Sequence, residues 1–296
     1  MARTSAVDGF ALAYFDTGTP PGGDPGRNAV LLHGWPGDSH DYRHVVPLLR
    51  DTVRVIVPDL RGFGESDRHL RDPDAYYSAS AQARSIAGLI AELALDRPVL
   101  AGYDVGSRVA QAVAAAHPES VGGLALSPPL PGSGTRVLEA QIVPELWYQY
   151  FHRSPLSVQL LDGQRDKVHA YLHHFWQHWS GPHFTVDGPE FESLVDSYAR
   201  PGAFEAAINW YRVGAGYVGH VLDERAPRAE DRLGVPTHVL WQELDPFFPR
   251  AWADRLGDFF TDITVHPVDG IGHFTPLEAP ADFAGIVRLA LAARVG

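Results

Sequence analysis

The sequence predicts an α/β fold, with a mostly parallel, doubly wound sheet and an inserted helical cap. In the first and last parts of the chain, short apolar runs alternate with segments of helical periodicity, a pattern typical of βαβ units. Between about residues 129 and 231 this alternation stops, and the periodic parts of an aromatic-rich segment look helical. We therefore expect a core built from residues 1–128 and 232–296, interrupted by a cap at 129–231.

Each expected strand is a short apolar run, typical of a strand buried on both faces. The runs lie at residues 29–32, 53–57, 99–101, 123–126, 236–241 and 263–265. Helices are expected at residues 78–93, 108–116, 250–259 and 281–293. In the first of these, Ile86, Leu89, Ile90 and Leu93 recur at helical spacing. The carboxyl edge of such a sheet is where ligands bind, so a cap inserted there is placed to cover a site.

Composition excludes several classes of protein. Of the 296 residues, 45% are hydrophobic and 20% are charged, as in an ordinary globular protein. The absence of cysteine rules out disulfides, thiolate metal sites and a cysteine nucleophile. A net charge of −12 argues against a nucleic-acid partner, which favours a basic surface. No apolar stretch is long enough to span a membrane, and the first residues lack a signal-peptide pattern. We therefore expect a cytoplasmic protein, and the near-exclusive use of arginine over lysine suggests a bacterial source.

The strongest motif is the pentapeptide GYDVG at residues 102–106, between an expected strand and an expected helix. In a G-x-S-x-G nucleophile elbow, the middle residue sits on a strained strand-to-helix turn flanked by glycines. Asp104 holds that position here. A carboxylate is already ionised at pH 7, and the amino end of the following helix favours negative charge. Asp104 is therefore the candidate nucleophile, the alternative being a simple helix N-cap.

A second motif, HGWPG at residues 33–37, directly follows the expected strand at 29–32. In this architecture one oxyanion donor is a backbone N–H of that loop, and the other belongs to the residue after the nucleophile. These positions correspond to Trp35 and Val105. Pro36 has no N–H to donate. For His33 we favour a structural role over that of a general base.

Two further loops supply a base and an acid that orients it. Asp245 follows the run at 236–241, and His273 follows the run at 263–265. The order Asp104, Asp245, His273 is the nucleophile–acid–histidine order associated with the elbow. Asp245 would fix the tautomer of His273, which would then take a proton from water. Glu243 is the rival acid, and we prefer Asp245 because it precedes the turn that leaves the strand.

Together these motifs resemble the epoxide hydrolase branch of the α/β-hydrolase family. The resemblance rests on residues 33–36 (HGWP), 59–66 (DLRGFGES), 102–106 (GYDVG) and 272–273 (GH). It implies an α/β-hydrolase fold, an aspartate nucleophile and no cofactor or metal. The partners that it implies are a small apolar epoxide and water, with a vicinal diol as product.

The resemblance also implies two cap tyrosines that hold the epoxide oxygen. Residues 147–152 (WYQYFH) resemble the segment of the first, and residues 209–212 (NWYR) that of the second. The roles fall to Tyr148 and Tyr211, with Tyr150 as the rival for the first. A phenol with a pKa near 10 can donate to a developing alkoxide without being ionised at pH 7.

Two other functions are compatible with these residues. Hydrolytic dehalogenases resemble this family, but haloalkane dehalogenases usually carry tryptophan where this chain has Val105. Fluoroacetate dehalogenases pair arginines one and four residues after the aspartate, and only Arg108 is present here. A non-catalytic binding protein of this fold commonly loses a triad member, whereas this chain retains all three.

The cap histidines and the oligomeric state are the last two features that the sequence addresses. The cap histidines at residues 173, 174, 178 and 183 show no complete ligand set and are expected to be ordinary helix residues. The sequence leaves the oligomeric state open, a homodimer included.

Overall fold

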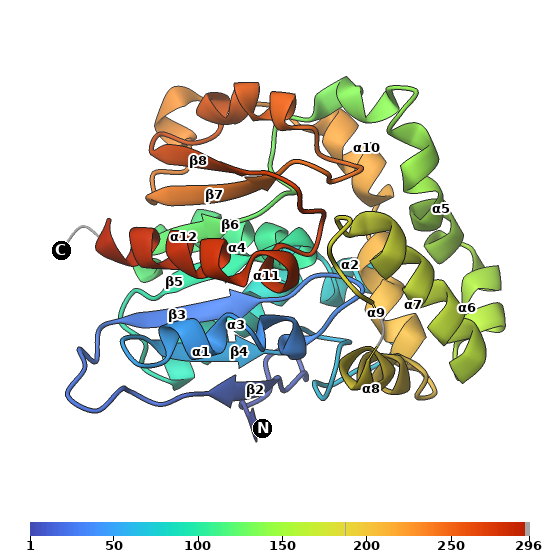
Figure 1. The fold of residues 1–296 in the computed structure, drawn as a ribbon, viewed down its shortest axis with the longest axis horizontal. Coiled ribbons are helices and arrows are strands. Elements are labelled where there is room, and N and C mark those ends of the chain that lie inside the picture. Colours follow the sequence, from blue (N-terminus) through green and yellow to red (C-terminus); the bar gives the residue numbers. More distant parts are fainter. Residues whose placement is uncertain (187, 294–296) are drawn as a thin grey trace.

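One eight-stranded sheet forms the centre of the protein (Figure 1). The computed structural model describes residues 1–186 and 188–293. The strands are β1 (Ala2–Arg3), β2 (Ala13–Asp16), β3 (Asn28–Leu32), β4 (Arg54–Pro58), β5 (Val99–Gly102), β6 (Gly123–Leu126), β7 (Thr237–Gln242) and β8 (Ile263–Val268). Their order across the sheet is β1-β2-β4-β3-β5-β6-β7-β8. Strands β3 to β8 pair in parallel, whereas β1 pairs with β2, and β2 with β4, in antiparallel orientation.

The apolar runs of the sequence become the parallel strands, with ends shifted by up to three residues. Every residue of β3, β5 and β6 is buried, because helices cover both faces of the sheet. The α/β-hydrolase fold class predicted from the sequence is confirmed by this topology.

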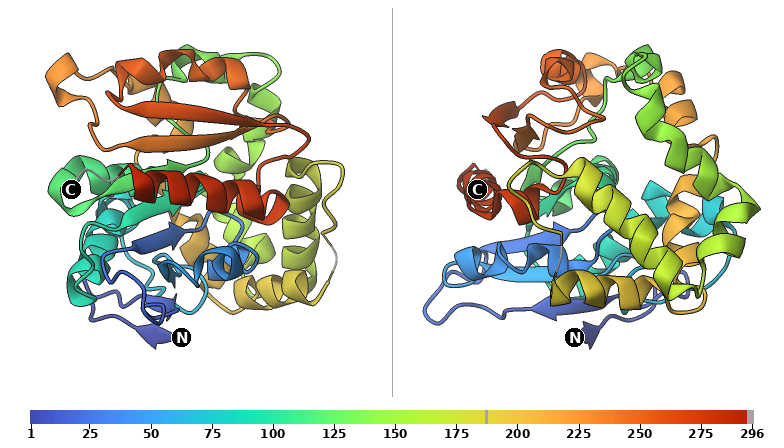
Figure 2. Two further views of the ribbon diagram at one scale, coloured as in Figure 1. Left: turned by 60° about the vertical axis from the view of Figure 1, so that its left-hand side comes forward. Right: turned by 45° about the vertical axis from the view of Figure 1, so that its right-hand side comes forward.

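Helices pack on both faces of the sheet (Figures 1 and 2). Helices α3 (Ala79–Glu92) and α4 (Asp104–Ala116) lie together on one face. Helices α1 (Val46–Leu49), α11 (Thr275–Glu278) and α12 (Pro280–Ala292) lie on the other. The apolar stripe of α3 is directed inward, with Ile86 and Leu89 fully buried.

Two helices differ from the expected ones. Helix α4 begins at Asp104, four residues before the expected start, because the turn that ends β5 leads straight into it. The expected helix at 250–259 is a tighter 3₁₀ helix, Arg250–Asp258. The remaining 3₁₀ helices are Ser39–Tyr42, Pro118–Ser120, Gly134–Leu138, Val143–Leu146 and Ala229–Asp231.

A helical layer lies at the carboxyl ends of the parallel strands, toward which the arrows in Figure 1 point. It comprises α5 (Trp147–Arg153), α6 (Pro155–Leu161), α7 (Arg165–Trp179), α8 (Pro189–Tyr198), α9 (Ala203–Arg212) and α10 (Gly216–Asp223). All six lie between β6 and β7 in the chain. The predicted cap, 129–231, includes these six helices together with the connections to both strands. The short core helix α2 (Pro73–Tyr76) contacts α9.

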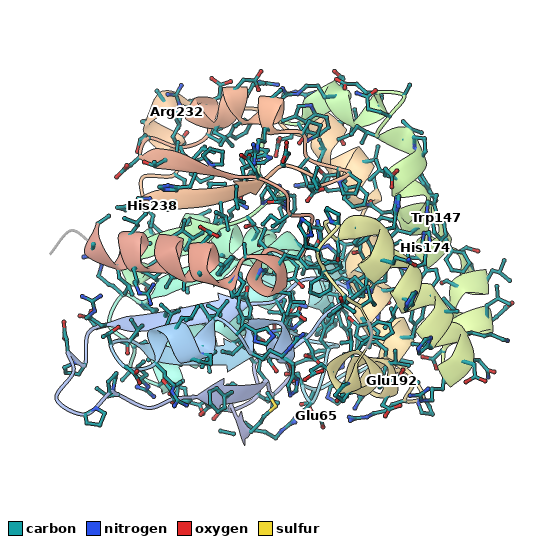
Figure 3. The ribbon with its side chains drawn as sticks, viewed as in Figure 1. Glu65, Trp147, His174, Glu192, Arg232 and His238 are labelled. Atoms are coloured by element: carbon teal, nitrogen blue, oxygen red, sulfur yellow. The ribbon has the colours of Figure 1, made fainter. Side chains whose placement is uncertain are left out.

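Cap and core are joined by specific contacts. Arg200 pairs with Glu65 of the core at 2.6 Å, and within the cap Arg165 pairs with Glu192 at the same distance. Glu65 and Glu192 are labelled in Figure 3. The indole N–H of Trp176 donates to the Pro36 carbonyl at 2.8 Å. The Tyr198 hydroxyl donates to the Gly37 carbonyl at 3.0 Å. Two cap helices thus hold the loop that follows β3.

Across residues 1–186 and 188–293, no helix combines the length and apolar character needed to cross a bilayer.

Candidate active site

Asp104 stands on a strained turn between β5 and α4. Its φ of +48° is the left-handed region that few residues other than glycine adopt. Gly102 and Gly106 make the turn feasible. A Cβ on Gly102 would lie 2.5 Å from the Gly106 carbonyl carbon, and one on Gly106 would overlap the Leu32 carbonyl oxygen. Strain of this kind clusters at functional sites, and it distinguishes Asp104 from an ordinary N-cap.

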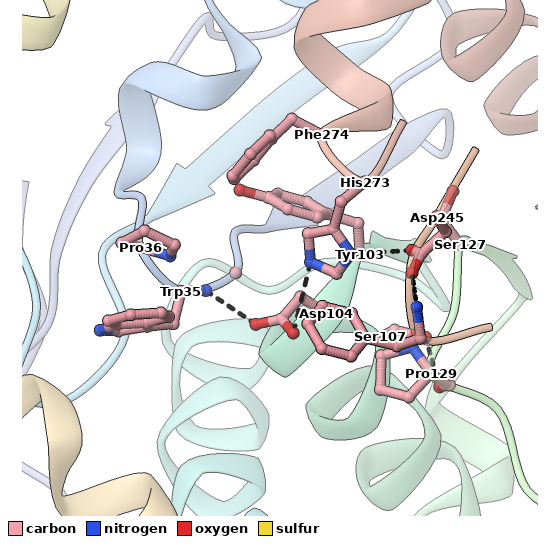
Figure 4. Close-up of polar contacts among 12 residues, drawn as sticks. Trp35, Pro36, Tyr103, Asp104, Ser107, Ser127, Pro129, Asp245, His273 and Phe274 are labelled. Carbon is pink, nitrogen blue, oxygen red and sulfur yellow. Dashed lines mark hydrogen bonds and ion pairs between the residues drawn. The ribbon is translucent and has the colours of Figure 1, made fainter. Parts of the chain in front are cut away.

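Both carboxylate oxygens of Asp104 have a defined neighbour (Figure 4). The backbone N–H of Trp35 donates to Oδ1 at 2.8 Å. Oδ2 lies 3.5 Å from Nε2 of His273. Val105, the other predicted oxyanion donor, is the second residue of α4 and is buried. Oδ1 is therefore held by a backbone donor, and Oδ2 faces the imidazole of His273.

His273 is buried between two carboxylates. Its Nδ1 lies 2.8 Å from Oδ2 of Asp245, and Asp245 also accepts from Gln242 Nε2 at 2.6 Å and the Phe247 N–H at 2.8 Å. Glu243, the rival acid, is exposed and accepts from the Gly270 N–H instead. The structure thus brings Asp104, His273 and Asp245 together and leaves Glu243 outside.

The two carboxylates control the charge of His273. Burial alone would lower the pKa of its imidazole, but the Asp245 charge and the contact with Asp104 at 3.5 Å outweigh burial and raise that pKa to about 10. At pH 7 the free protein therefore holds an imidazolium between two carboxylates. Loss of the Asp104 charge would remove part of this stabilisation and favour the neutral imidazole.

We expect this arrangement to make stability depend on pH. The folded pKa of His273, about 10, lies above its ordinary value of 6.5, so its contribution is complete below pH 6.5 and is lost as pH rises toward 10. Urea unfolding of wild type and His273→Gln between pH 6 and 10 measures it. The difference in free energy of unfolding should fall by at least about 1.4 kcal/mol, the equivalent of one pKa unit. A difference that stays constant would contradict the assigned charge.

His33 has a structural role in the loop after β3. The Leu60 N–H donates to its Nε2 at 3.0 Å, and its Nδ1 lies 2.9 Å from the Gly34 carbonyl oxygen. Both ring nitrogens are therefore occupied, and the side chain is completely buried. This geometry agrees with the structural role that we favoured over that of a base.

Tyr148 and Tyr211 face the same cavity as Asp104. Tyr148 lies on α5 and Tyr211 on α9, and reciprocal hydrogen bonds join the two helices. Arg153 donates to the Tyr211 carbonyl, and Arg212 donates to the His152 carbonyl, each at 3.0 Å. The two phenol rings meet edge to face with centroids 5.4 Å apart.

Both cap phenols stay protonated at neutral pH. Burial, then the nearby Asp104 charge, raises the pKa of Tyr148, and burial, then Tyr148 and Asp104, raises the pKa of Tyr211. Each hydroxyl is therefore available as a donor. Tyr150, the rival for the first role, is 63% exposed, whereas Tyr148 is 4% exposed. The geometry favours Tyr148, and its role stays a prediction.

The site opens into a cavity of about 770 Å³. Besides the catalytic candidates, its walls include residues that sequence reasoning did not single out: Ser78, Ser80, Val213, Tyr217, His220, Phe247 and Phe248. Phe247 stands two residues after Asp245, so its position near the site could have been predicted from the sequence. The cap residues 213–220 carry no motif and come to the site only by tertiary packing.

Most of the cap histidines lie at the surface. In the described part of the chain, no three histidine, aspartate or glutamate side chains are arranged to hold a metal ion. His174, His178 and His183 are exposed, and His174 is labelled on the outer side of the cap in Figure 3. His178 lies 2.7 Å from Glu145, an ordinary surface contact.

The fold and this geometry define an α/β-hydrolase. The family model described as the alpha/beta hydrolase fold matches residues 30–280, and the chain belongs to this family. Within the family, the chain resembles proteins named epoxide hydrolases, at 25% to 27% identity.

Known proteins of two activities resemble the chain over most of its length. The soluble epoxide hydrolase of Corynebacterium sp. (strain C12) is 25% identical over 283 residues, which cover 93% of this chain and 91% of that protein. The fluoroacetate dehalogenase of Burkholderia sp. is 29% identical over 281 residues, covering 90% and 87%. The crystal structure of an epoxide hydrolase from Bacillus megaterium in complex with an inhibitor matches with a TM-score of 0.79 at 20% identity, covering 97% of this chain and 99% of that one. That last likeness shows the shared fold.

Proposed function

We propose that the protein is an epoxide hydrolase that converts an epoxide to a vicinal diol through an ester on Asp104. The observation that carries the proposal is that the Asp104 carboxylate and two buried, protonated phenols, Tyr148 and Tyr211, line the same cavity. A nucleophile and proton donors on the same cavity are what ring opening requires. The alternative of a non-catalytic binding protein gives no reason for a strained carboxylate beside a paired histidine.

In the first step Asp104 Oδ2 attacks an epoxide carbon. The carbon–oxygen bond of the ring breaks, and the oxygen takes a proton from Tyr148 or Tyr211. The Trp35 N–H keeps Oδ1 in place. The product is an alkyl ester of Asp104 with a neighbouring hydroxyl group, and one tyrosine is left as a phenolate.

In the second step water attacks the carbonyl carbon of the Asp104 ester. Esterification removes one of the charges that raise the His273 pKa, so the imidazolium can release its proton to restore the phenol and become the base that accepts a proton from water. The oxyanion forms on Oδ1, held by the Trp35 N–H and, as predicted, by that of Val105. When this intermediate collapses, the bond between the carbonyl carbon and Oδ2 breaks, and the departing oxygen takes the proton of the newly added hydroxyl. This returns the carboxylate and releases the diol.

Hydrolytic dehalogenation is the second candidate. It is favoured by the likeness to the Burkholderia dehalogenase and by Arg108, which lines the cavity. Against it, the residue after the nucleophile is Val105, which has neither an indole N–H for a halide nor a guanidinium for a carboxylate. A cavity of about 770 Å³ also greatly exceeds the size of a haloacetate.

A substrate panel separates the candidates. Purified protein would be mixed with aromatic and aliphatic epoxides, with haloalkanes and fluoroacetate alongside, while diol and halide release are followed. Diol formation with no halide release supports the proposal. Halide release with no diol formation would replace it with dehalogenation, and neither product across the panel would favour the binding protein.

Removing the two cap hydroxyls should affect ring opening. Tyr211→Phe should lower epoxide turnover without unfolding the protein, and Tyr148→Phe/Tyr211→Phe should lower it by roughly 100-fold or more, because each phenol partly replaces the other. Single-turnover kinetics of ester formation measures the effect, with Tyr150→Phe as the matched exposed control. Full activity in the double variant would remove both tyrosines from the mechanism. If activity survives there and is lost on adding Tyr150→Phe, the first role belongs to Tyr150.

A further inference from the structure

Arg108 places a charged guanidinium group on the cavity wall, one helical turn beyond Asp104. We infer that Arg108 selects epoxides bearing a neutral hydrogen-bond acceptor, such as an amide or ketone oxygen, about one helical turn from the ring. The inference rests on the proposed function and narrows the expected substrate, which the sequence described only as a small apolar epoxide.

The cavity follows α4 well past the nucleophile. Its lining includes Asp104, Arg108, Ala112 and Ala116, which lie on successive turns of that helix. At 1.5 Å rise per residue, the distance from Asp104 to Ala116 along the axis is about 18 Å, and that to Arg108 is about 6 Å. Alanines beyond Arg108 leave open, apolar space. The cavity therefore suits an elongated molecule with one polar group near its reacting end.

The guanidinium of Arg108 has unused hydrogen-bonding capacity. Its side chain is only 17% exposed, and its closest carboxylate oxygen, on Glu224, is 3.9 Å away, beyond hydrogen-bond range. Within residues 1–186 and 188–293, this guanidinium donates no hydrogen bond to protein, although it carries five N–H donors. A largely desolvated cation with free donors facing a cavity is a binding group for an acceptor.

The charge around Arg108 is already balanced, which favours a neutral acceptor over an anion. Glu224 is 13% exposed on its side chain, and the Gly132 N–H holds its Oε2 at 2.7 Å. Burial, and after it the Arg108 charge, lower the pKa of His220, which also lines the cavity and is therefore neutral at pH 7. A carboxylate on the substrate would add an uncompensated charge beside Glu224, whereas an amide oxygen would not.

The test uses styrene oxides that differ only at the para position, on the far side of the ring from the epoxide. The three probes carry a carboxamide, an isopropyl group or a carboxylate. The measured quantity is the ratio of kcat/KM between probes, for wild type, Arg108→Met and Glu224→Gln. Because each ratio is compared between variants, intrinsic differences in reactivity cancel. Arg50→Met, at an exposed arginine outside the cavity lining, is the control for loss of one positive charge.

We expect Arg108→Met to lower the carboxamide-to-isopropyl ratio by about tenfold or more, the value of one hydrogen bond to a charged group. Arg50→Met should leave it unchanged. Glu224→Gln should raise the carboxylate-to-carboxamide ratio about fivefold, because a neighbouring negative charge is removed. If the carboxamide-to-isopropyl ratio is the same in Arg108→Met as in wild type, the inference would be overturned. If Arg108→Met lowers the carboxylate-to-isopropyl ratio more than the carboxamide-to-isopropyl ratio, the neutral class would equally be overturned.

A binding measurement keeps this inference separate from the proposed function. The diols of the same three probes are stable ligands, and calorimetry gives their affinity for wild type and Arg108→Met whether or not epoxides are turned over. Tighter binding of the carboxamide diol than of the isopropyl diol, lost in Arg108→Met, supports the inference even if the proposed chemistry fails. Equal affinities in wild type would refute it even if diols are produced.

Discussion

His273→Gln should accumulate an ester on Asp104 instead of releasing diol. Asp104 needs no base, since it is a carboxylate already held by the Trp35 N–H, so ring opening should proceed. Hydrolysis needs a proton to be drawn from water, and glutamine cannot accept it. Steady diol formation should fall by about 10³-fold or more, within the range by which acid–base groups contribute. A serine nucleophile would behave differently, because it needs its histidine in the first step.

Intact-protein mass spectrometry after mixing with a reactive epoxide measures this effect. The mass of one substrate should be added in His273→Gln and not persist in wild type, and peptide mapping should place the adduct between Val99 and Arg108. Unmodified protein that still binds substrate would count against aspartate catalysis. An adduct on another carboxylate would show that the nucleophile is not Asp104.

Asp104→Asn should abolish both ester and diol, the largest loss that we expect, at least about 10⁴-fold in turnover. The amide is nearly isosteric and its oxygen can still accept from the Trp35 N–H, so the fold should survive. The neutral residue is a poor nucleophile. Turnover and intact mass, with circular dichroism as the control for folding, are the measurements. The variant Asp104→Asn/His273→Gln should carry no adduct, and an adduct there would place the reactive group elsewhere.

Local sequence signals were sufficient for the parts of the protein that depend on few residues. The buried runs predicted five of the parallel strands, because a strand covered on both faces is apolar throughout. The run at 263–265 also forms a parallel strand, but the expectation that it is buried on both faces was wrong, because β8 lies at the edge of the sheet and is only partly buried. The turn at Asp104 was readable because two glycines flank it, where any Cβ would collide with backbone. Asp245 and His273 were readable because each follows a strand whose carboxyl end meets the same edge of the sheet.

The cap was less readable, since it depends on packing between distant residues. Helix α5 has only seven residues and carries aromatic side chains on several faces, so periodicity alone did not separate Tyr148 from Tyr150. In the sequence, Arg108 stood out only as one of the two arginines that fluoroacetate dehalogenases carry after the aspartate. Its contact with Glu224 joins α4 to the residue that follows α10, and no local sequence pattern encodes that contact.

Trp35 belongs to both halves of the protein. Its backbone N–H holds Asp104, while its fully buried ring stacks on Tyr148 at 5.5 Å and meets Phe175 at 5.0 Å and Tyr211 at 5.6 Å. A cap grafted from a relative would bring its own packing around residue 35 and so reposition the donor. In this chain, a change of the cap that alters substrate range should therefore also alter the rate of ester hydrolysis.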